Sequence, residues 1–159
     1  MSRSAVAGVL VVITALAVAV LSGQAENLQV GTWKMNIAKS KFSTGTGFKS
    51  ATSRIEPVPG GVKHTVDSVY ADGTTRRYEY TTTYDGKDVP VTGNSPYGDT
   101  TALTRIDANT TRTVYKNKGT VMVIQMSVVS ADGRTRTVTT KGTNPAGQTV
   151  DNLSVYDRQ

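Results

Sequence analysis

Turn signals recur along most of the chain and divide it into short segments. Each signal contains Gly, Asn or Asp, whose backbones adopt or tolerate the left-handed angles that tight hairpins need. Their spacing is roughly the 8–12 residues typical of all-β sandwiches and barrels. The turns are Pro59-Gly60-Gly61, Ala71-Asp72-Gly73, Asp85-Gly86, Gly93-Asn94, Asp107-Ala108-Asn109, Asn117-Lys118-Gly119, Asp132-Gly133 and Asn144-Pro145-Ala146-Gly147. This pattern predicts a series of antiparallel hairpins.

The segments between the turns are rich in Thr, Val and Tyr, which suit a pleated, half-buried surface. No segment has a convincing helical period. About ten strands are therefore predicted, near 28–35, 49–57, 62–70, 74–84, 87–92, 100–106, 110–116, 120–130, 134–143 and 148–157. The segment 120–130 is apolar on both faces, so we expect it to be the most buried strand.

The inward faces of these strands contain few large aliphatic side chains and many Thr, Ser and Tyr. Two packed sheets would need more Leu, Ile and Phe than this chain has. A closed barrel with a partly polar, partly empty interior suits the composition better. We therefore expect an all-β protein, a single antiparallel up-and-down β-barrel of about ten strands.

The N-terminus has the layout of a secretory signal peptide. Arg3 precedes an uncharged apolar run from Ala5 to Leu21, and Gly23 and Ala25 are small residues at the −3 and −1 positions of a cleavage site. The alternative is a transmembrane anchor, but the run is only about as long as the shortest bilayer span, and no cationic cluster follows it. We expect a signal peptide over 1–25 and a barrel domain over 26–159. The mature protein would then be periplasmic or extracellular, with no transmembrane segment.

Composition excludes several kinds of chemistry. The chain has no Cys and one His, so it has no disulfide, no cysteine nucleophile and no His-rich metal site. No paired carboxylates or Ser/His/Asp arrangement stand out. We therefore expect a protein that is not an enzyme and that needs no cofactor or metal.

Alternation predicts one wall of a ligand site. Side chains in a strand point alternately to its two faces, so Arg76, Tyr78, Tyr80 and Tyr84 share a face of the strand over 74–84. Their rings could bury apolar ligand surface, while the hydroxyls and the guanidinium orient a polar head. The alternative is an ordinary cross-strand ladder. A register slip of one residue would invert which side chains face inward.

Two resemblances extend this prediction. The segments Gly31-Thr32-Trp33-Lys34-Met35 and Ser154-Val155-Tyr156-Asp157-Arg158 resemble the first and last strands of fatty-acid-binding proteins, in the lipocalin-like calycin superfamily. The stretches Asn36–Phe42 and Tyr84–Asn94 resemble a group of small exported bacterial lipocalin-like proteins with no established function. The second resemblance spans nearly the whole chain after residue 25 and implies a barrel, but no particular activity.

The resemblance to fatty-acid-binding proteins also implies residue roles. It places Trp33 near the closed end of the barrel and makes Tyr156 a ligand contact. These proteins pair that Tyr with an Arg two residues earlier, where this chain has Ser154. Arg76 or Arg136 could replace the missing guanidinium if either points inward. Their helical lid is replaced here by a short loop over 36–48.

These observations leave three functions open. The first is binding of a small apolar or amphipathic ligand in the barrel, with Arg76, Tyr78, Tyr80, Tyr84 and Tyr156 as ligand-binding residues. The second is a structural or stress-related envelope protein with a closed barrel and a basic adhesive surface. The third is a haem-binding barrel that uses His64, the one group that titrates near neutrality.

The chain carries a formal charge of +6. Basic residues gather around the first loop, and they suit anionic envelope polymers or lipid head groups as partners. No basic-aromatic module for nucleic acid is present. The basic residues concerned are Lys34, Lys39, Lys41, Lys49 and Arg54.

Overall fold

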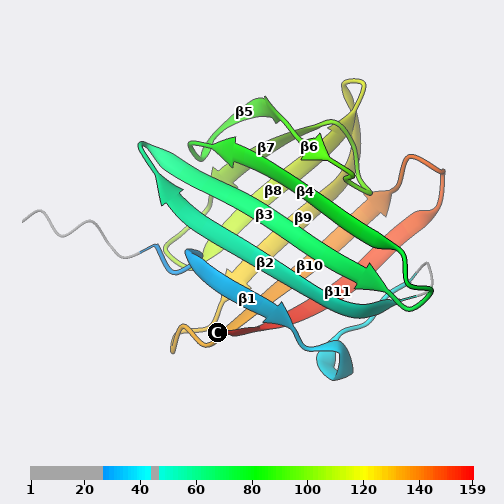
Figure 1. Cartoon of the computed structure of the whole chain (residues 1–159). Helices are drawn as coiled ribbons and strands as arrows, with labels where there is room; N and C mark the ends of the chain where they lie inside the picture. The colour runs from blue at the N-terminus through cyan, green and yellow to red at the C-terminus, as the bar shows by residue number, and fades with distance from the viewer. Residues whose placement is uncertain (1–26, 44–46) are drawn as a thin grey trace, which may run out of the picture.

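The computed structural model describes residues 27–43 and 47–159 and shows one antiparallel barrel (Figure 1). One short 3-10 helix, η1 (Ile37–Lys39), follows the first strand. The strands are β1 (Gly31–Met35), β2 (Phe48–Val58), β3 (Gly61–Tyr70), β4 (Thr75–Thr82), β5 (Asp85–Pro90), β6 (Thr92–Gly93), β7 (Thr100–Arg105), β8 (Thr110–Asn117), β9 (Thr120–Val129), β10 (Thr135–Thr143) and β11 (Thr149–Arg158). The all-β fold class predicted from turns and alternation is confirmed.

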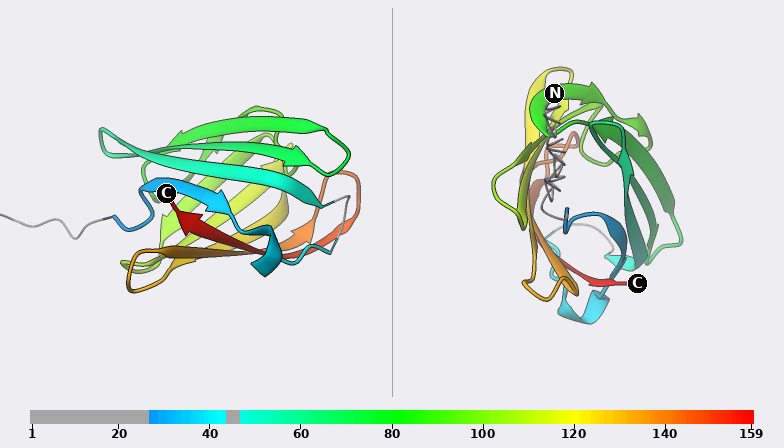
Figure 2. Two further views of the ribbon diagram at one scale, coloured as in Figure 1. Left: turned by 60° about the horizontal axis from the view of Figure 1, so that its bottom comes forward. Right: turned by 90° about the vertical axis from the view of Figure 1, so that its left-hand side faces the viewer.

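All eleven strands belong to one sheet, whose order is β5-β7-β8-β9-β10-β11-β1-β2-β3-β4-β6. The first strand, β1, pairs with the last strand, β11, so the two ends of the described chain meet in the wall of the barrel. The two sheet edges are β5 and β6, which are consecutive in sequence. Seen along its length, the sheet encloses an interior (Figure 2).

The one strand predicted over 87–92 is divided between these two edges. Its first part belongs to β5, which pairs with β7, and its last residue, Thr92, begins β6, which pairs with β4. Pro90 ends β5 and has no N–H to donate to a ladder. The chain thus crosses from one edge to the other at Val91 and links them covalently.

The expectation that 120–130 is the most buried strand is wrong. Only Val123, Ser127 and Val129 of β9 are buried, whereas Val121 and Val128 are exposed. The outer face of this strand meets no second layer, so its apolar side chains remain at the surface.

Residues 27–30 lie across one end of the barrel. The Asn27 side chain donates to the Tyr84 hydroxyl, and Gln29 Nε2 donates to the carbonyl of Asn109. Arg158 donates to the carbonyls of Leu28 and Val30. These bonds join residues 27–30 to the rim of the barrel. We call this end of the barrel the closed end.

Trp33 is completely buried at the closed end, as the resemblance implied. Its indole N–H donates to the carbonyl of Gln29 at 2.9 Å, and the Arg158 guanidinium carbon lies 4.1 Å from its ring centroid. Ile55, Val62, Leu103 and other apolar residues form one core cluster with it.

The predicted signal peptide over 1–25 lies outside the described residues. Within residues 27–43 and 47–159, the structure contains no helix that is both long and apolar enough to span a bilayer.

Candidate ligand-binding cavity

A cavity occupies the barrel interior between the closed end and the opposite end. Its empty volume is about 580 Å³, which includes space open to solvent. Apolar and aromatic side chains line it together with hydroxyls, amides and one guanidinium. The lining comprises Met35, Phe48, Ala51, Ser53, His64, Val66, Ser68, Tyr70, Tyr78, Pro96, Tyr97, Gln125, Arg136, Val138, Thr140, Asn152, Ser154 and Tyr156.

The cavity continues into a second hollow at the end away from residues 27–30, which we call the mouth. Phe48, Tyr70, Pro96, Tyr97 and Asn152 line both spaces. The hollow also touches Asn144 and Gln148, in the hairpin turn between β10 and β11. In Figure 1 the mouth is the right-hand end of the barrel, where the β3–β4 and β10–β11 turns lie.

Two of the predicted ligand-binding residues line the main cavity. Tyr78 on β4 and Tyr156 on β11 are both buried and come from well-separated parts of the barrel wall. Tyr80, two residues after Tyr78 on the same face, lines a smaller cavity nearer the closed end. Tyr78 and Tyr80 thus lie on the interior side of β4, as their alternation in the sequence predicts.

The remaining two predicted residues lie at opposite ends. Arg76 shares the inward face but sits at the mouth, where Nη1 donates to Asn94 and the guanidinium carbon lies 5.6 Å from the Tyr70 ring centroid. Tyr84 is not in β4, because that strand ends at Thr82 and Tyr84 has a φ of 63°. Its ring lies instead at the closed end, under the Arg105 guanidinium.

A buried arginine is the centre of the cavity's polar network. Arg136, on β10, is only 5% exposed. Its Nη1 donates to the Ser53 hydroxyl at 2.8 Å, and its Nε donates to the Ser127 hydroxyl at 2.7 Å. Arg136 lies directly opposite Tyr156 in the β10–β11 register, and its guanidinium carbon is 5.6 Å from that ring's centroid.

From Ser53 the network continues to β3 and β4. The Ser53 oxygen is 2.7 Å from His64 Nε2, and His64 Nδ1 is 2.6 Å from the Tyr80 hydroxyl. Since Arg136 uses Ser53 as an acceptor, the Ser53 proton is available to His64 Nε2. In the tautomer that accepts this proton, His64 Nδ1–H donates to the Tyr80 hydroxyl.

From Ser127 the network continues to the closed end. The Ser127 hydroxyl donates to Gln29 Oε1 at 2.9 Å, and Gln29 in turn donates to the carbonyl of Asn109. Both branches therefore begin at N–H groups of the Arg136 guanidinium, which is a donor only.

Burial controls the ionisation of these groups. Desolvation, and then the Arg136 charge, lower the pKa of His64 well below its usual value, so the imidazole is neutral at physiological pH. Desolvation also lowers the pKa of Arg136, although a guanidinium remains protonated. Burial raises the pKa values of Tyr78 and Tyr156, which are therefore neutral phenols.

The geometry gives no support to His64 as a haem ligand. Both of its ring nitrogens are within hydrogen-bonding distance of hydroxyls, those of Ser53 and Tyr80, so neither is left open for iron. Among residues 27–43 and 47–159, no group of three or more His, Asp or Glu side chains is placed to hold a metal ion.

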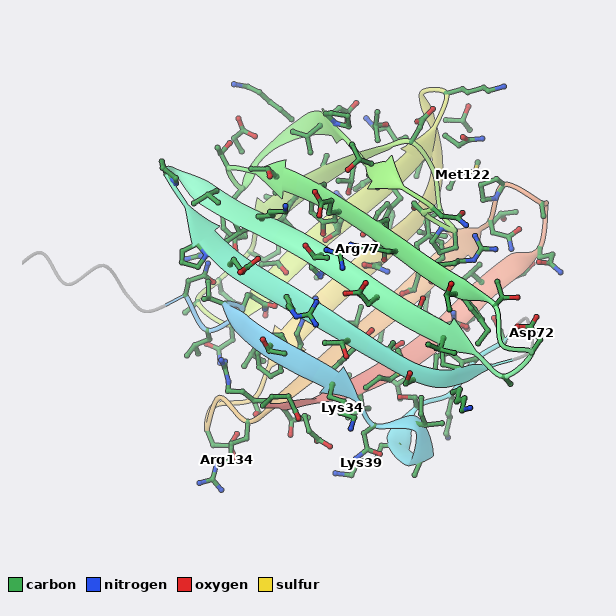
Figure 3. The ribbon with its side chains drawn as sticks, viewed as in Figure 1. Lys34, Lys39, Asp72, Arg77, Met122 and Arg134 are labelled. Carbon is green, nitrogen blue, oxygen red and sulfur yellow. The ribbon has the colours of Figure 1, made fainter. Side chains whose placement is uncertain are left out.

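The basic residues of the first loop lie outside the barrel, away from the cavity. Figure 3 shows Lys34 and Lys39 on the side of β1 and η1. Arg54 is paired with Asp67 at 2.8 Å on the outer surface. Lys41 and Lys49 are also exposed.

Alternation along the strands did not predict Arg136 as the main polar group of the cavity, although Arg136 was a possible substitute for the missing guanidinium. A signal was present, because Arg136 alternates with Val138 and Thr140, and all three are buried on the inner face of β10. The partner serines gave no such signal, since Ser53 and Ser127 lie far apart in the sequence and meet only in the closed barrel.

No family model matches this chain, and a search of curated proteins finds no significant match.

Proposed function

We propose that this chain is an exported, non-enzymatic binding protein that holds a small apolar or amphipathic molecule in its barrel cavity. The observation that carries the proposal is a cavity lined by both apolar and polar side chains and continuous with a mouth at one end. Ligand sites commonly combine a mainly apolar lining with a few placed polar groups. Apolar and aromatic side chains make up about half of this lining, and hydroxyls, amides, one imidazole and one guanidinium make up the rest.

The described chemistry favours binding over catalysis. The titratable groups of the cavity are a neutral histidine, a guanidinium and neutral phenols. None of the carboxylates in the described part of the chain is buried. Without an acid–base pair or an activated nucleophile, these residues can orient a ligand but are poorly suited to transform it.

Native mass spectrometry of protein purified without detergent tests the proposal. We expect an adduct that is lost on denaturation and whose extract identifies the ligand class. Val138→Phe, which places a ring in the cavity, should remove the adduct. Val128→Phe makes the same change on the exposed outer face of the wall and should retain it.

A different result would favour the alternative function. If the parent protein shows no adduct and no thermal stabilisation by amphiphiles, the proposal fails. The better account would then be an envelope protein whose exposed basic residues contact anionic polymers or lipid head groups.

A further inference from the structure

The outer surface of the barrel differs between two opposite walls. In Figure 1, β2–β4 face the viewer and β8–β10 lie behind them. On the outer face of β2–β4, Asp67 pairs with Arg54 at 2.8 Å and with Arg77 at 2.9 Å, and Lys63 lies 3.0 Å from Glu79. The charges of this wall thus compensate one another at the surface.

The outer face of β8–β11 has a different composition. Ser127 and Arg136 point into the barrel, so Val128 and Thr137 point outward. The strand pairing arranges the outward side chains in three rows across the four strands. The rows are Thr110, Val128, Thr137 and Val155; Arg112, Met126, Thr139 and Leu153; and Val114, Ile124, Lys141 and Asp151. We call these side chains the β8–β11 face.

The β8–β11 face is mostly uncharged and lacks a cover. Nine of its twelve side chains are aliphatic residues, methionine or threonine. All eleven strands lie in one sheet, so no second sheet covers this face within residues 27–43 and 47–159. Val128 is 44% exposed. At the spacings of a β-sheet the three rows cover roughly 400 Å², and a largely apolar patch of this size often marks an interaction surface.

The unpaired charges of this face lie at its two edges. Arg112, on β8, takes part in none of the ion pairs formed by residues 27–43 and 47–159. Asp151, on β11, has a side chain that is 63% exposed and lies 3.6 Å from an equally solvated Lys141. Three strand spacings, about 14 Å, separate Arg112 from Asp151 within one chain. The face therefore has a cationic edge, an apolar centre and an edge that carries an accessible carboxylate.

We propose that the β8–β11 face is the interface of a symmetric dimer, in which a second copy of this chain covers it. A two-fold axis parallel to the strands, between β9 and β10, places β8 of each copy over β11 of the other. Arg112 of one copy then comes within reach of Asp151 of the second copy, on both sides of the axis. An acidic edge would instead repel an anionic surface, so charge favours the second copy as the occupant.

The same arrangement matches the sizes of the central side chains. It places β9 of each copy over β10 of the other, so that Met126 and Val128 pack over the smaller Thr139 and Thr137. Two copies would bury about 800 Å² at the face itself, and the rim pairs would bring this close to the roughly 1,000 Å² of a small specific interface. We therefore expect a dissociation constant in the micromolar range. The cavity lies on the inner side of the wall, so this proposal is independent of ligand binding.

Sedimentation equilibrium tests the dimer, using protein purified without detergent at concentrations from roughly 1 µM to roughly 500 µM. Val128→Glu should weaken the dimer at least about tenfold, because it buries a carboxylate in the apolar centre of the interface. Thr81→Glu is the matched control. It places the same charge at an exposed outward position of β4, in the opposite wall, and should leave the dissociation constant unchanged.

A charge exchange tests the orientation of the two copies. Arg112→Glu and Asp151→Arg should each weaken the dimer, since each places like charges together at the rim. The double variant should restore it. Because about 14 Å separates the two positions in one chain, such a rescue reports contact between copies.

Three results would overturn the proposal. The first is a parent protein that remains monomeric over the whole concentration range. The second is a dimer that Val128→Glu and Thr81→Glu affect equally, or that the double variant fails to restore. The third is a monomeric parent that binds phosphatidylglycerol vesicles and loses this binding in Val128→Glu, which would assign the face to a lipid surface instead.

Discussion

His64 on β3 lies directly opposite Tyr80 on β4, and its Nδ1 is 2.6 Å from the Tyr80 hydroxyl inside the barrel. With Ser53 at the other ring nitrogen, the imidazole is enclosed by two hydroxyls and by the nearby Arg136 charge. No acidic side chain in the described structure compensates a proton on this ring. The histidine is thus a neutral structural link whose protonation opposes folding.

The first prediction concerns the dependence of stability on pH. The folded-state pKa of His64 lies well below its usual 6.5, so below that value the unfolded chain gains a proton that the folded chain does not. Stability is therefore fully present above about pH 6.5, and it falls by about 1.4 kcal/mol for each pH unit below it until the folded-state pKa is reached. Urea unfolding at about pH 7.5 and about pH 5.5 should show a loss of about 1.4 kcal/mol in the parent.

The matched variant for this experiment is His64→Gln, which keeps a polar side chain but has no proton to gain. Because His64 is the only histidine in the chain, the variant should lose most of the difference between the two pH values. A parent protein whose stability is flat over this range, or a variant that keeps the full slope, would contradict the prediction.

The second prediction concerns the cost of the buried guanidinium. Arg136→Met removes an uncompensated charge, while Ser53 keeps His64 as a partner and Ser127 keeps Gln29. We expect the ligand-free variant to gain about 1 kcal/mol of unfolding free energy, since replacing buried charges by apolar groups is often stabilising. Urea unfolding followed by the fluorescence of Trp33, the only tryptophan, provides the measurement. A loss of about 2 kcal/mol or more would instead identify Arg136 as a structural brace.

The third prediction concerns the closed end. Arg158 donates to the carbonyls of Gly133, Val30 and Leu28 and covers the Trp33 ring. Arg158→Ala should lower the unfolding free energy by about 3 kcal/mol, because it leaves three carbonyls without this donor and removes a cation–π contact. It should also shift the Trp33 emission to longer wavelength.

Arg134→Ala is the control for the closed end, since this arginine is exposed in the neighbouring turn. We expect it to leave both the unfolding midpoint and the emission unchanged. Equal effects of the two substitutions would show that Arg158 does not hold residues 28–30 in place.

The fourth prediction concerns Gly142 in β10, which has a φ of 143°. A Cβ at this position would overlap the carbonyl oxygen of Met122 on the neighbouring strand. Gly147 has a φ of 79° in the adjoining turn, and a Cβ there would meet nothing within 4 Å. Gly142→Ala should therefore cost about 2 kcal/mol more than Gly147→Ala, as measured by thermal unfolding. Equal costs would show that the overlap with Met122 is relieved at no expense.

The candidate site was partly predictable from the sequence. Alternation correctly grouped Tyr78 and Tyr80 on one inner face, because a strand repeats every two residues whatever its partners are. Tyr84 escaped this rule because the left-handed backbone at that residue lies beyond the end of β4. Arg76 shares the inner face, yet its position along the strand places it at the mouth, and strand position relative to the barrel ends depends on the register of every neighbour.

The sequence by itself determined the class of fold and most of its strands. Turn residues and period-2 alternation are local, and they act in the same way in any antiparallel sheet. The tertiary structure alone decided which side chains meet. Ser53, His64, Arg136 and Tyr156 come from four strands, and only closure of the barrel in one register brings them around one cavity. The unpaired charge of Arg136 is likewise a property of that closure, because burial and the distance to every carboxylate are set by the folded chain and by no local pattern.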